Sequence, residues 1–182
     1  MKVLTDPGST VVAVDGSYRY HTLGFGYLGD TGSWWLRLRP LAAHERRGPR
    51  ALHAELHSFA SVIEHHPGAL EVLCDCWAAV ELVRAWQAGQ SDPIPGYSGR
   101  RLRTLGASVL ARSAPLSVRW VPGHAGHPLN EGADALARLA SRALTDGLSM
   151  PAVRSRAVGL ASAFALAFAA SESSMLETEI GA

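Results

Sequence analysis

Residues 121–140 read VPGHAGHPLNEGADALARLA, a glycine-rich loop that leads directly into a helix. Glycine or proline occupies four of its first eight positions, which is typical of a turn, and Pro128 suits the first turn of a helix. Beyond it, apolar residues recur at helical spacing, and Asn130 and Asp134, four residues apart, share one helix face. The stretch therefore predicts a mobile imidazole, that of His124, close to a carboxylate.

The composition predicts a single globular domain. The chain has 182 residues, of which 47% are hydrophobic and 18% charged, enough for a sizeable core. Its formal net charge of +1 is not the strongly basic balance that by itself indicates nucleic-acid binding. Cys74 and Cys76 lie one residue apart in an expected strand, a poor geometry for a mutual disulfide. Because residues 1–10 turn polar at once, unlike a leader peptide, we expect a reducing, cytoplasmic location.

Three antiparallel strands are predicted to open the chain. The segments TVVAVDGSYR (10–19) and LGFGYLG (23–29) are rich in strand-forming residues, and DTGS (30–33) has the composition of a hairpin turn. WWLRLRPLA (34–42) then alternates large and charged residues with leucine. After a polar, basic loop, HAELHSFASVIEHH (53–66) has the apolar spacing of a helix.

The middle of the chain alternates strands with helices. LEVLCDC (70–76) and LSVRWV (116–121) are expected strands, the first of them buried. Between them lie an expected helix over 78–90, a loop over 91–99 and a second helix over 100–113. Antiparallel strands first and helix-connected strands later describe an α/β fold with a five-stranded mixed sheet flanked by helices.

The composition changes after residue 144. We expect a main domain over residues 9–144, followed over 145–182 by a linker and an apolar helical tail. The run VGLASAFALAFAA (158–170) is 13 residues long, well short of the ~20 needed to cross a bilayer. Leu160, Phe164 and Phe168 would form one stripe of that helix. The tail is therefore expected to pack on the domain or on a second copy of the chain, giving possible self-association and no membrane contact.

Four acids stand at the ends of these elements. Asp15 and Asp75 each end a strand, Glu55 lies in the first turn of a helix, and Asp134 lies near the start of another. If the two strands are neighbours, the carboxylates converge without an obvious basic partner, which is costly in a buried setting. A pair of divalent cations with oxygen ligands resolves that cost, and Mg²⁺ is the usual choice. Two such ions favour hydrolysis of a phosphodiester, with His124 moving protons.

The motifs in this order resemble those of a type 1 ribonuclease H over roughly residues 9–144. VDGSY resembles the strand-one motif of that family, AEL its helix Glu, CDC its strand-four Asp, and GHAGHPLNEGADALA its His loop and Asp helix. The resemblance implies a ribonuclease H-like fold and endonucleolytic cleavage of the RNA strand of RNA–DNA hybrids with two Mg²⁺ ions, Mn²⁺ being possible. It assigns the metal ligands and catalytic acids Asp15, Glu55, Asp75 and Asp134, and the proton shuttle His124.

The same resemblance bears on substrate binding. It implies that the backbone near Gly16 and Ser17 touches the RNA strand. The family usually has an Asn just before its helix Glu, where this chain has Leu52, and a polar residue where this chain has Trp77. Trp77 either packs or stacks on a base or sugar of the substrate.

The loop over 91–99 is too short to be the basic protrusion of some family members. Hybrid binding is therefore expected to rest on scattered arginines, which are Arg46, Arg47, Arg50 and those of 100–103.

Two alternatives to hybrid cleavage stay open at this point. The altered residues around the site fit a binding module that keeps the acids but has little turnover, and the fold also serves nucleases that act on double-stranded RNA. Retention of all four acids and of His124 favours an enzyme, because a binding module has no use for a costly acidic centre. His53 and His57, four residues apart on the helix that carries Glu55, are interpreted as solvated surface residues.

Overall fold

A five-stranded mixed sheet forms the centre of the molecule, with strand order β3-β2-β1-β4-β5. The computed structural model describes residues 8–46, 48–91, 93–97 and 99–180. Strands β1, β2 and β3 are antiparallel neighbours, whereas β4 and β5 run parallel to β1. The strands are β1 (Thr10–Arg19), β2 (Thr22–Gly29), β3 (Trp34–Pro40), β4 (Leu70–Cys74) and β5 (Leu116–Trp120). The predicted mixed sheet is confirmed.

Two tight turns connect the antiparallel strands. The turn between β1 and β2 places Tyr20 and His21 at φ 44° and 64°, in the left-handed region that most residues avoid. The turn between β2 and β3 is closed by a hydrogen bond from the amide of Gly29 to the carbonyl of Ser33, with Gly32 at φ 78°. The second turn is the predicted DTGS hairpin.

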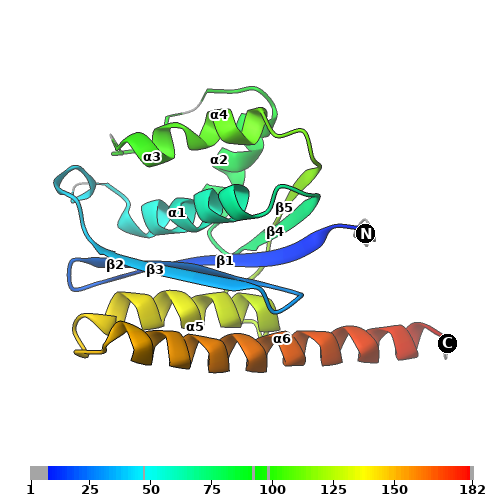
Figure 1. Cartoon of the computed structure of the whole chain (residues 1–182). Coiled ribbons are helices and arrows are strands. Elements are labelled where there is room, and N and C mark those ends of the chain that lie inside the picture. Colours follow the sequence, from blue (N-terminus) through cyan, green and yellow to red (C-terminus); the bar gives the residue numbers. More distant parts are fainter. Residues whose placement is uncertain (1–7, 47, 92, 98, 181–182) are drawn as a thin grey trace.

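Helices cover both faces of the sheet, as Figure 1 shows. Helix α1, with α2, α3 and α4 outside it, lies on one face, and α5 lies on the other with α6 against it. The helices are the short 3₁₀ helix η1 (Ala43–Glu45), α1 (Arg50–His65), α2 (Trp77–Gln87), α3 (Arg100–Arg103), α4 (Leu105–Leu110), α5 (Pro128–Ala143) and α6 (Met150–Ile180). The single helix expected over 100–113 is thus two short helices that meet at Thr104.

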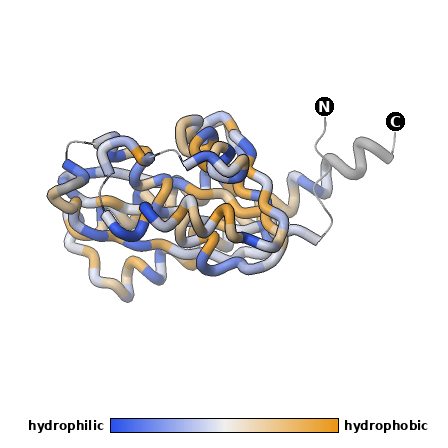
Figure 2. The backbone as a smooth tube through the Cα atoms, turned by 90° about the horizontal axis from the view of Figure 1, so that it is seen from above, coloured by the Kyte–Doolittle hydropathy of each residue, from blue (hydrophilic) through white to orange (hydrophobic). Residues whose placement is uncertain are grey.

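The sheet separates two hydrophobic cores because successive residues of β1 point to opposite faces. Val12 and Val14 belong to the core under α1 and α2, while Ala13, between them, belongs to the core under α5 and α6. Figure 2, viewed from above, shows hydrophobic segments recurring along the central elements of the chain. This alternation matters for the site, because it puts Asp15 on the α5 side of β1 and Gly16 on the α1 side.

Helix α6 is longer than its apolar run suggested. It packs on α5 through Val153, Ala157 and Ala161, which are buried, and through the predicted stripe of Leu160, Phe164 and Phe168. Its other face is exposed. By length and composition alone, residues Met150–Ser174 would suffice to span a membrane, contrary to the count of 13 residues, although the helix here lies along the domain.

Candidate active site

Neighbouring strands bring the first two predicted acids together. The register of β1 and β4 pairs Ala13 with Leu73, so Asp15 and Asp75 each follow two positions farther along. A residue and its second neighbour share one face of a strand, so both carboxylates emerge at the same end of the sheet. The adjacency that the sequence predicted for these strands is confirmed.

Glu55 joins them because α1 lies very close to β1. A Cβ atom on Gly16 would fall 2.3 Å from the backbone of Glu55, so only glycine permits this approach. Ser58, one turn along α1, stabilises the contact between α1 and the sheet. Its hydroxyl donates to the carbonyl of Asp15 at 2.5 Å and accepts from the amide of Gly26 at 3.2 Å. Helix α1 is thus held to two strands at the position of the acid.

The side chains of Asp15, Glu55 and Asp75, here called the acid trio, form one compact group. One ligand oxygen from each lies within 4.8 Å of the others. Asp15 and Glu55 are buried and Asp75 is half-buried. Within the described part of the chain, no Lys or Arg forms an ion pair with any member of the trio.

Burial and mutual repulsion both act on these carboxyl groups. Burial, followed by the charges of Asp134 and Asp75, raises the pKa of Asp15 well above its ordinary value. Burial, followed by the charges of Asp15 and Asp75, likewise raises the pKa of Glu55, against a backbone hydrogen bond from Gly16. Both ionised forms are therefore disfavoured in the protein without a cation. Hard oxygen donors with no internal cation are the donor set that suits Mg²⁺ or Mn²⁺.

The loop after β5 completes the surroundings of Asp75. Asn130, at the start of α5, donates to Oδ2 of Asp75 at 3.3 Å. A Cβ on Gly123 would lie 2.9 Å from the same oxygen, so the loop backbone passes directly over it. Any larger residue at position 123 would press on that oxygen, so glycine permits the close approach.

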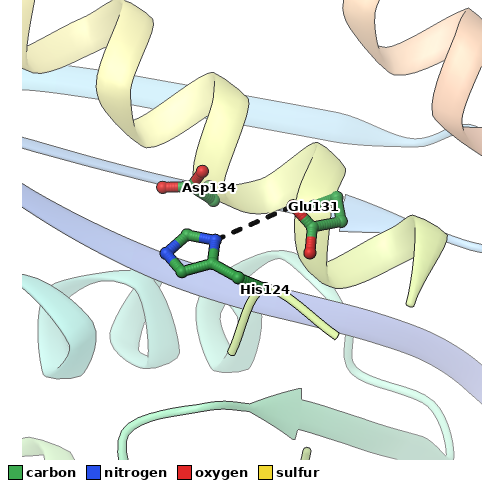
Figure 3. Close-up of side chains that lie close together, drawn as sticks. All are labelled: His124, Glu131 and Asp134. Atoms are coloured by element: carbon green, nitrogen blue, oxygen red, sulfur yellow. Dashed lines mark ion pairs between the residues drawn. The ribbon is translucent and has the colours of Figure 1, made fainter. Parts of the chain in front are cut away.

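The predicted proximity of His124 and Asp134 is present (Figure 3). Ligand atoms of His124, Glu131 and Asp134 lie within 4.8 Å of one another, and Nδ1 of His124 is 3.9 Å from Oε2 of Glu131. The imidazole is 72% exposed, and its backbone has φ 54°. Glu131 also accepts the amide of Gly126 at 3.3 Å, which fixes the loop to the helix. This φ lies in the left-handed region that most residues avoid, as it does at Tyr20 and His21.

Asp134 has a partner that the sequence analysis missed. It receives a hydrogen bond from Arg138 at 2.9 Å, an i,i+4 pair on α5. The four acids are therefore not one unpaired group: three form the trio, and the fourth is partly neutralised beside it. The spacing DALAR, Asp134 to Arg138, carried this information in the sequence.

The predicted substrate-binding residues lie in different settings. Ser17 shares a hydrogen bond with Ser141 of α5 at 3.0 Å. Arg50 donates to the carbonyl of Arg46 at 2.6 Å and lies over the ring of Tyr18. Trp77 is exposed at the start of α2.

Leu52, which replaces the Asn of the family, and Arg101, one of the arginines expected to contact the hybrid, both have structural contacts. Leu52 is buried in the α1 core. Arg101 ties α3 to α1 by donating to Glu64 at 2.9 Å and to Ser61 at 3.1 Å. Arg47 lies outside the described residues.

The interpretation of His53 and His57 as surface residues was wrong, because both are buried. His57 contacts Arg39 at 2.6 Å and Glu45 at 3.4 Å, and Arg39 also donates to both oxygens of Glu45. Burial, with Arg39 adding to it, lowers the pKa of His57 to about 4. His53 instead contacts the carbonyl of Pro95 at 2.8 Å. The partners come from separate elements, so helical spacing alone gave no sign of them.

Comparisons with known proteins agree with this geometry. The model of the RNase H family matches residues 7–142. A ribonuclease H of Acidiphilium cryptum (strain JF-5) is 37% identical over 70 residues, which are 37% of this chain and 40% of that protein. A ribonuclease H of Anaeromyxobacter sp. (strain K) is 30% identical over 124 residues, 61% of each chain. The matches thus span less than two thirds of these relatives. The family match covers most of the chain, and the chain belongs to the ribonuclease H family.

Proposed function

We propose that this protein is a metal-dependent endonuclease that hydrolyses the RNA strand of RNA–DNA hybrids. The observation that carries the proposal is the acid trio, Asp15, Glu55 and Asp75, gathered within 4.8 Å at one end of the sheet of a ribonuclease H family member. A buried set of carboxylates with raised pKa values is costly to maintain, and cation binding is the function that offsets the cost.

The trio would hold two divalent ions, Mg²⁺ or Mn²⁺, with Asp134 as an outer ligand beside them. Such ions supply Lewis-acid stabilisation of the charge that develops on a phosphate during hydrolysis. Asn130 orients Asp75 through its 3.3 Å hydrogen bond. Arg138 orients Asp134 in the same way and limits the repulsion that Asp134 exerts on Asp15.

His124 would move the proton that leaves or joins the reacting oxygens. Its imidazole is exposed, lies on a loop with glycine on both sides, and faces Glu131 at 3.9 Å. An exposed imidazole on a loop can reach both water and a bound phosphate. We propose general acid–base catalysis as its role.

The substrate would lie across the same end of the sheet. We propose that the RNA strand contacts the backbone of Gly16 and Ser17 and that Arg50 contacts a phosphate. Trp77 comes two residues after Asp75 and would contact the nucleotide next to the scissile phosphate. We also propose a cytoplasmic protein, since Cys74 and Cys76 are both free, and self-association through the exposed face of α6.

Incubation with labelled nucleic acids tests the function. Wild type, Asp75→Asn and the control Asp146→Asn, which changes an exposed acid in the turn after α5, are each mixed with an RNA–DNA hybrid, duplex RNA or duplex DNA. Reactions contain Mg²⁺, Mn²⁺ or EDTA. We expect cleavage of the RNA strand of the hybrid with either metal, none with EDTA, none by Asp75→Asn, and normal cleavage by Asp146→Asn.

Other outcomes separate the alternatives. Preferential cleavage of duplex RNA would replace the proposed substrate. Metal-dependent hybrid binding without cleavage would identify a binding module. Equal activity in Asp75→Asn and wild type would contradict the assignment of the trio.

A further inference from the structure

Two exposed tryptophans meet beside the acid trio. Trp77 begins α2, two residues after Asp75, and Trp120 ends β5. Their rings lie 6.1 Å apart at 81°, with 55% of Trp77 and 41% of Trp120 exposed. Trp77 was a predicted substrate contact, whereas the position of Trp120 at the end of a strand gave no sign of a partner in the sequence.

This exposure sets the pair apart from the other tryptophans. Trp86 is buried, and Trp35 stacks on Tyr27. Exposed aromatic surface is unfavourable in water, and two such rings in contact form a patch of the kind that marks binding sites.

A hydrogen bond from a tryptophan side chain to the backbone of Asp75 holds the pair beside the site. Nε1 of Trp120 donates to the carbonyl of Asp75 at 2.9 Å. On the other side, the guanidinium of Arg84 lies 5.9 Å from the Trp77 ring and is itself held by the carbonyl of Val118 at 3.1 Å. A planar group resting on Trp77 would therefore lie at a set distance from the residue that carries the Asp75 carboxylate.

We propose that Trp77 and Trp120 form a binding site for an unpaired nucleobase next to the scissile phosphate. The inference rests on the proposed nuclease function. A flat, exposed aromatic ring beside a cation suits any base, because every base has a π face. The site would thus select for the pairing state of the nucleotide and not for its identity.

The energies of base stacking and of unpairing indicate which substrates should bind more tightly. One base–aromatic stack contributes about 1–3 kcal/mol, whereas drawing a base out of a regular duplex costs about a few kcal/mol, and less at a mismatch. For a fully paired hybrid the two nearly cancel. A hybrid with a mismatched or unpaired ribonucleotide gains the stack at little cost, so it should bind more tightly and be cleaved next to that nucleotide.

Binding of three labelled ligands tests the proposal in EDTA, where cleavage is suppressed. They are a fully paired RNA–DNA hybrid, the same hybrid with one central mismatch, and the single RNA strand. We expect wild type to bind the mismatched hybrid about 10-fold more tightly than the paired one, since about 1.4 kcal/mol corresponds to tenfold. Trp77→Leu should remove this preference, and Trp77→Phe should keep most of it.

The control is Trp34→Leu, which changes a tryptophan on β3 that packs on the α6 side of the sheet. It should leave the preference unchanged. A preference that persists in Trp77→Leu, or wild-type affinities that are equal for both hybrids, would overturn the proposal. If Trp77→Leu does not fold by circular dichroism, Trp120→Leu serves the same test with the same criterion.

The failure of this inference is distinguishable from failure of the nuclease proposal. Cleavage of the paired hybrid in Mg²⁺ with no preference that depends on Trp77 would remove the base site and keep the nuclease. A mismatch preference that depends on Trp77, in a protein that cleaves nothing, would keep the base site and remove the nuclease.

Discussion

Two of the places where the molecule buries acids differ in how they accommodate the charge. Glu45 is fully buried, yet its carboxylate binds Arg39 through both oxygens and accepts the amide of Ala42 at 3.1 Å. Burial raises its pKa, but the hydrogen bonds from His57, Arg39 and Ala42 outweigh that effect and hold the pKa far below the usual range. In the acid trio, burial and like charges act together, so the pKa values rise.

The difference shows that burial alone does not identify a functional acid. The Glu45 network, meaning Arg39, Glu45 and His57, satisfies its charge internally and so joins β3, η1 and α1 structurally. The trio has no internal cation among the described residues, so its charge is available to an external one. Substitutions should therefore separate the regions: those in the trio should lower activity, and those in the Glu45 network should lower stability.

The largest expected effect is that of Asp75→Asn on activity. Loss of one ligand oxygen should lower kcat by about a thousandfold or more, because metal stabilisation contributes several kcal/mol and each 1.36 kcal/mol is tenfold. The free energy of unfolding in EDTA should stay the same or rise, since a repelling charge is removed. Hybrid cleavage and urea unfolding measure the two quantities. A large loss of stability would mean that Asp75 is a structural residue.

Glu45→Gln should show the reverse pattern. It leaves the partly buried guanidinium of Arg39 without its anion, which costs about 3 kcal/mol of unfolding free energy by analogy with other broken buried pairs. The control Glu64→Gln breaks the exposed pair with Arg101 and should cost about 1 kcal/mol or less. Denaturant unfolding measures both, and kcat should be unchanged where the variants are folded. Equal losses of unfolding free energy in Glu45→Gln and Glu64→Gln would contradict a structural role for the Glu45 network.

The histidines extend the comparison. His124→Ala should lower kcat about 100-fold, at the low end for general acid–base groups because water can partly replace an exposed ring. Its stability should be unchanged. His57→Ala should instead lower stability and leave kcat intact, since His57 is buried among structural partners. Steady-state kinetics and thermal unfolding of both variants measure these effects. The assignment is wrong if His57→Ala lowers kcat and His124→Ala lowers stability.

The smallest expected effect is a pH dependence of opposite sign in the two regions. A raised pKa at Asp15 means that the ionised carboxyl destabilises the native state, an effect absent below the ordinary pKa and complete above the raised one. In EDTA, Asp15→Asn should therefore become more stable relative to wild type as pH rises from 4 to 8. Mg²⁺ should abolish the gain. A gain independent of pH would argue against the raised pKa.

The Glu45 network gives the matching test at acid pH. Its lowered pKa means that Glu45 contributes stability above its ordinary pKa, and this contribution is lost as pH falls through the lowered value. His57, with its pKa lowered to about 4, also loses stability as pH falls from its ordinary value of 6.5. Wild type should therefore lose more stability than Glu45→Gln as pH falls below the ordinary pKa of 4.5, as unfolding curves at pH 5 and 3 would measure.

Most of the fold, and the adjacency of the strands that carry Asp15 and Asp75, could be predicted from the sequence, because the signals are local. The division of the four acids into the trio and the Asp134–Arg138 pair was not predicted. Asp15 and Asp75 follow buried strands, and the α5 loop carries a dense set of turn residues, so short stretches held the information. Contacts between distant segments were not predictable in this way. Glu45 stands in a polar loop, and its partners Arg39 and His57 lie on a strand and a helix that only the fold brings together. The long extent of α6 was also missed, because its apolar run was counted without its polar helical ends.

The order of the functional residues along the chain determines the order in which they are synthesised. Asp15 sits on the central strand, whereas His124 and Asp134 belong to the loop and helix that follow the last strand of the sheet. A chain emerging from the ribosome would carry the three residues of the acid trio well before α5 could dock beside them. The proposed active site would thus stay incomplete until the last part of the domain had been synthesised.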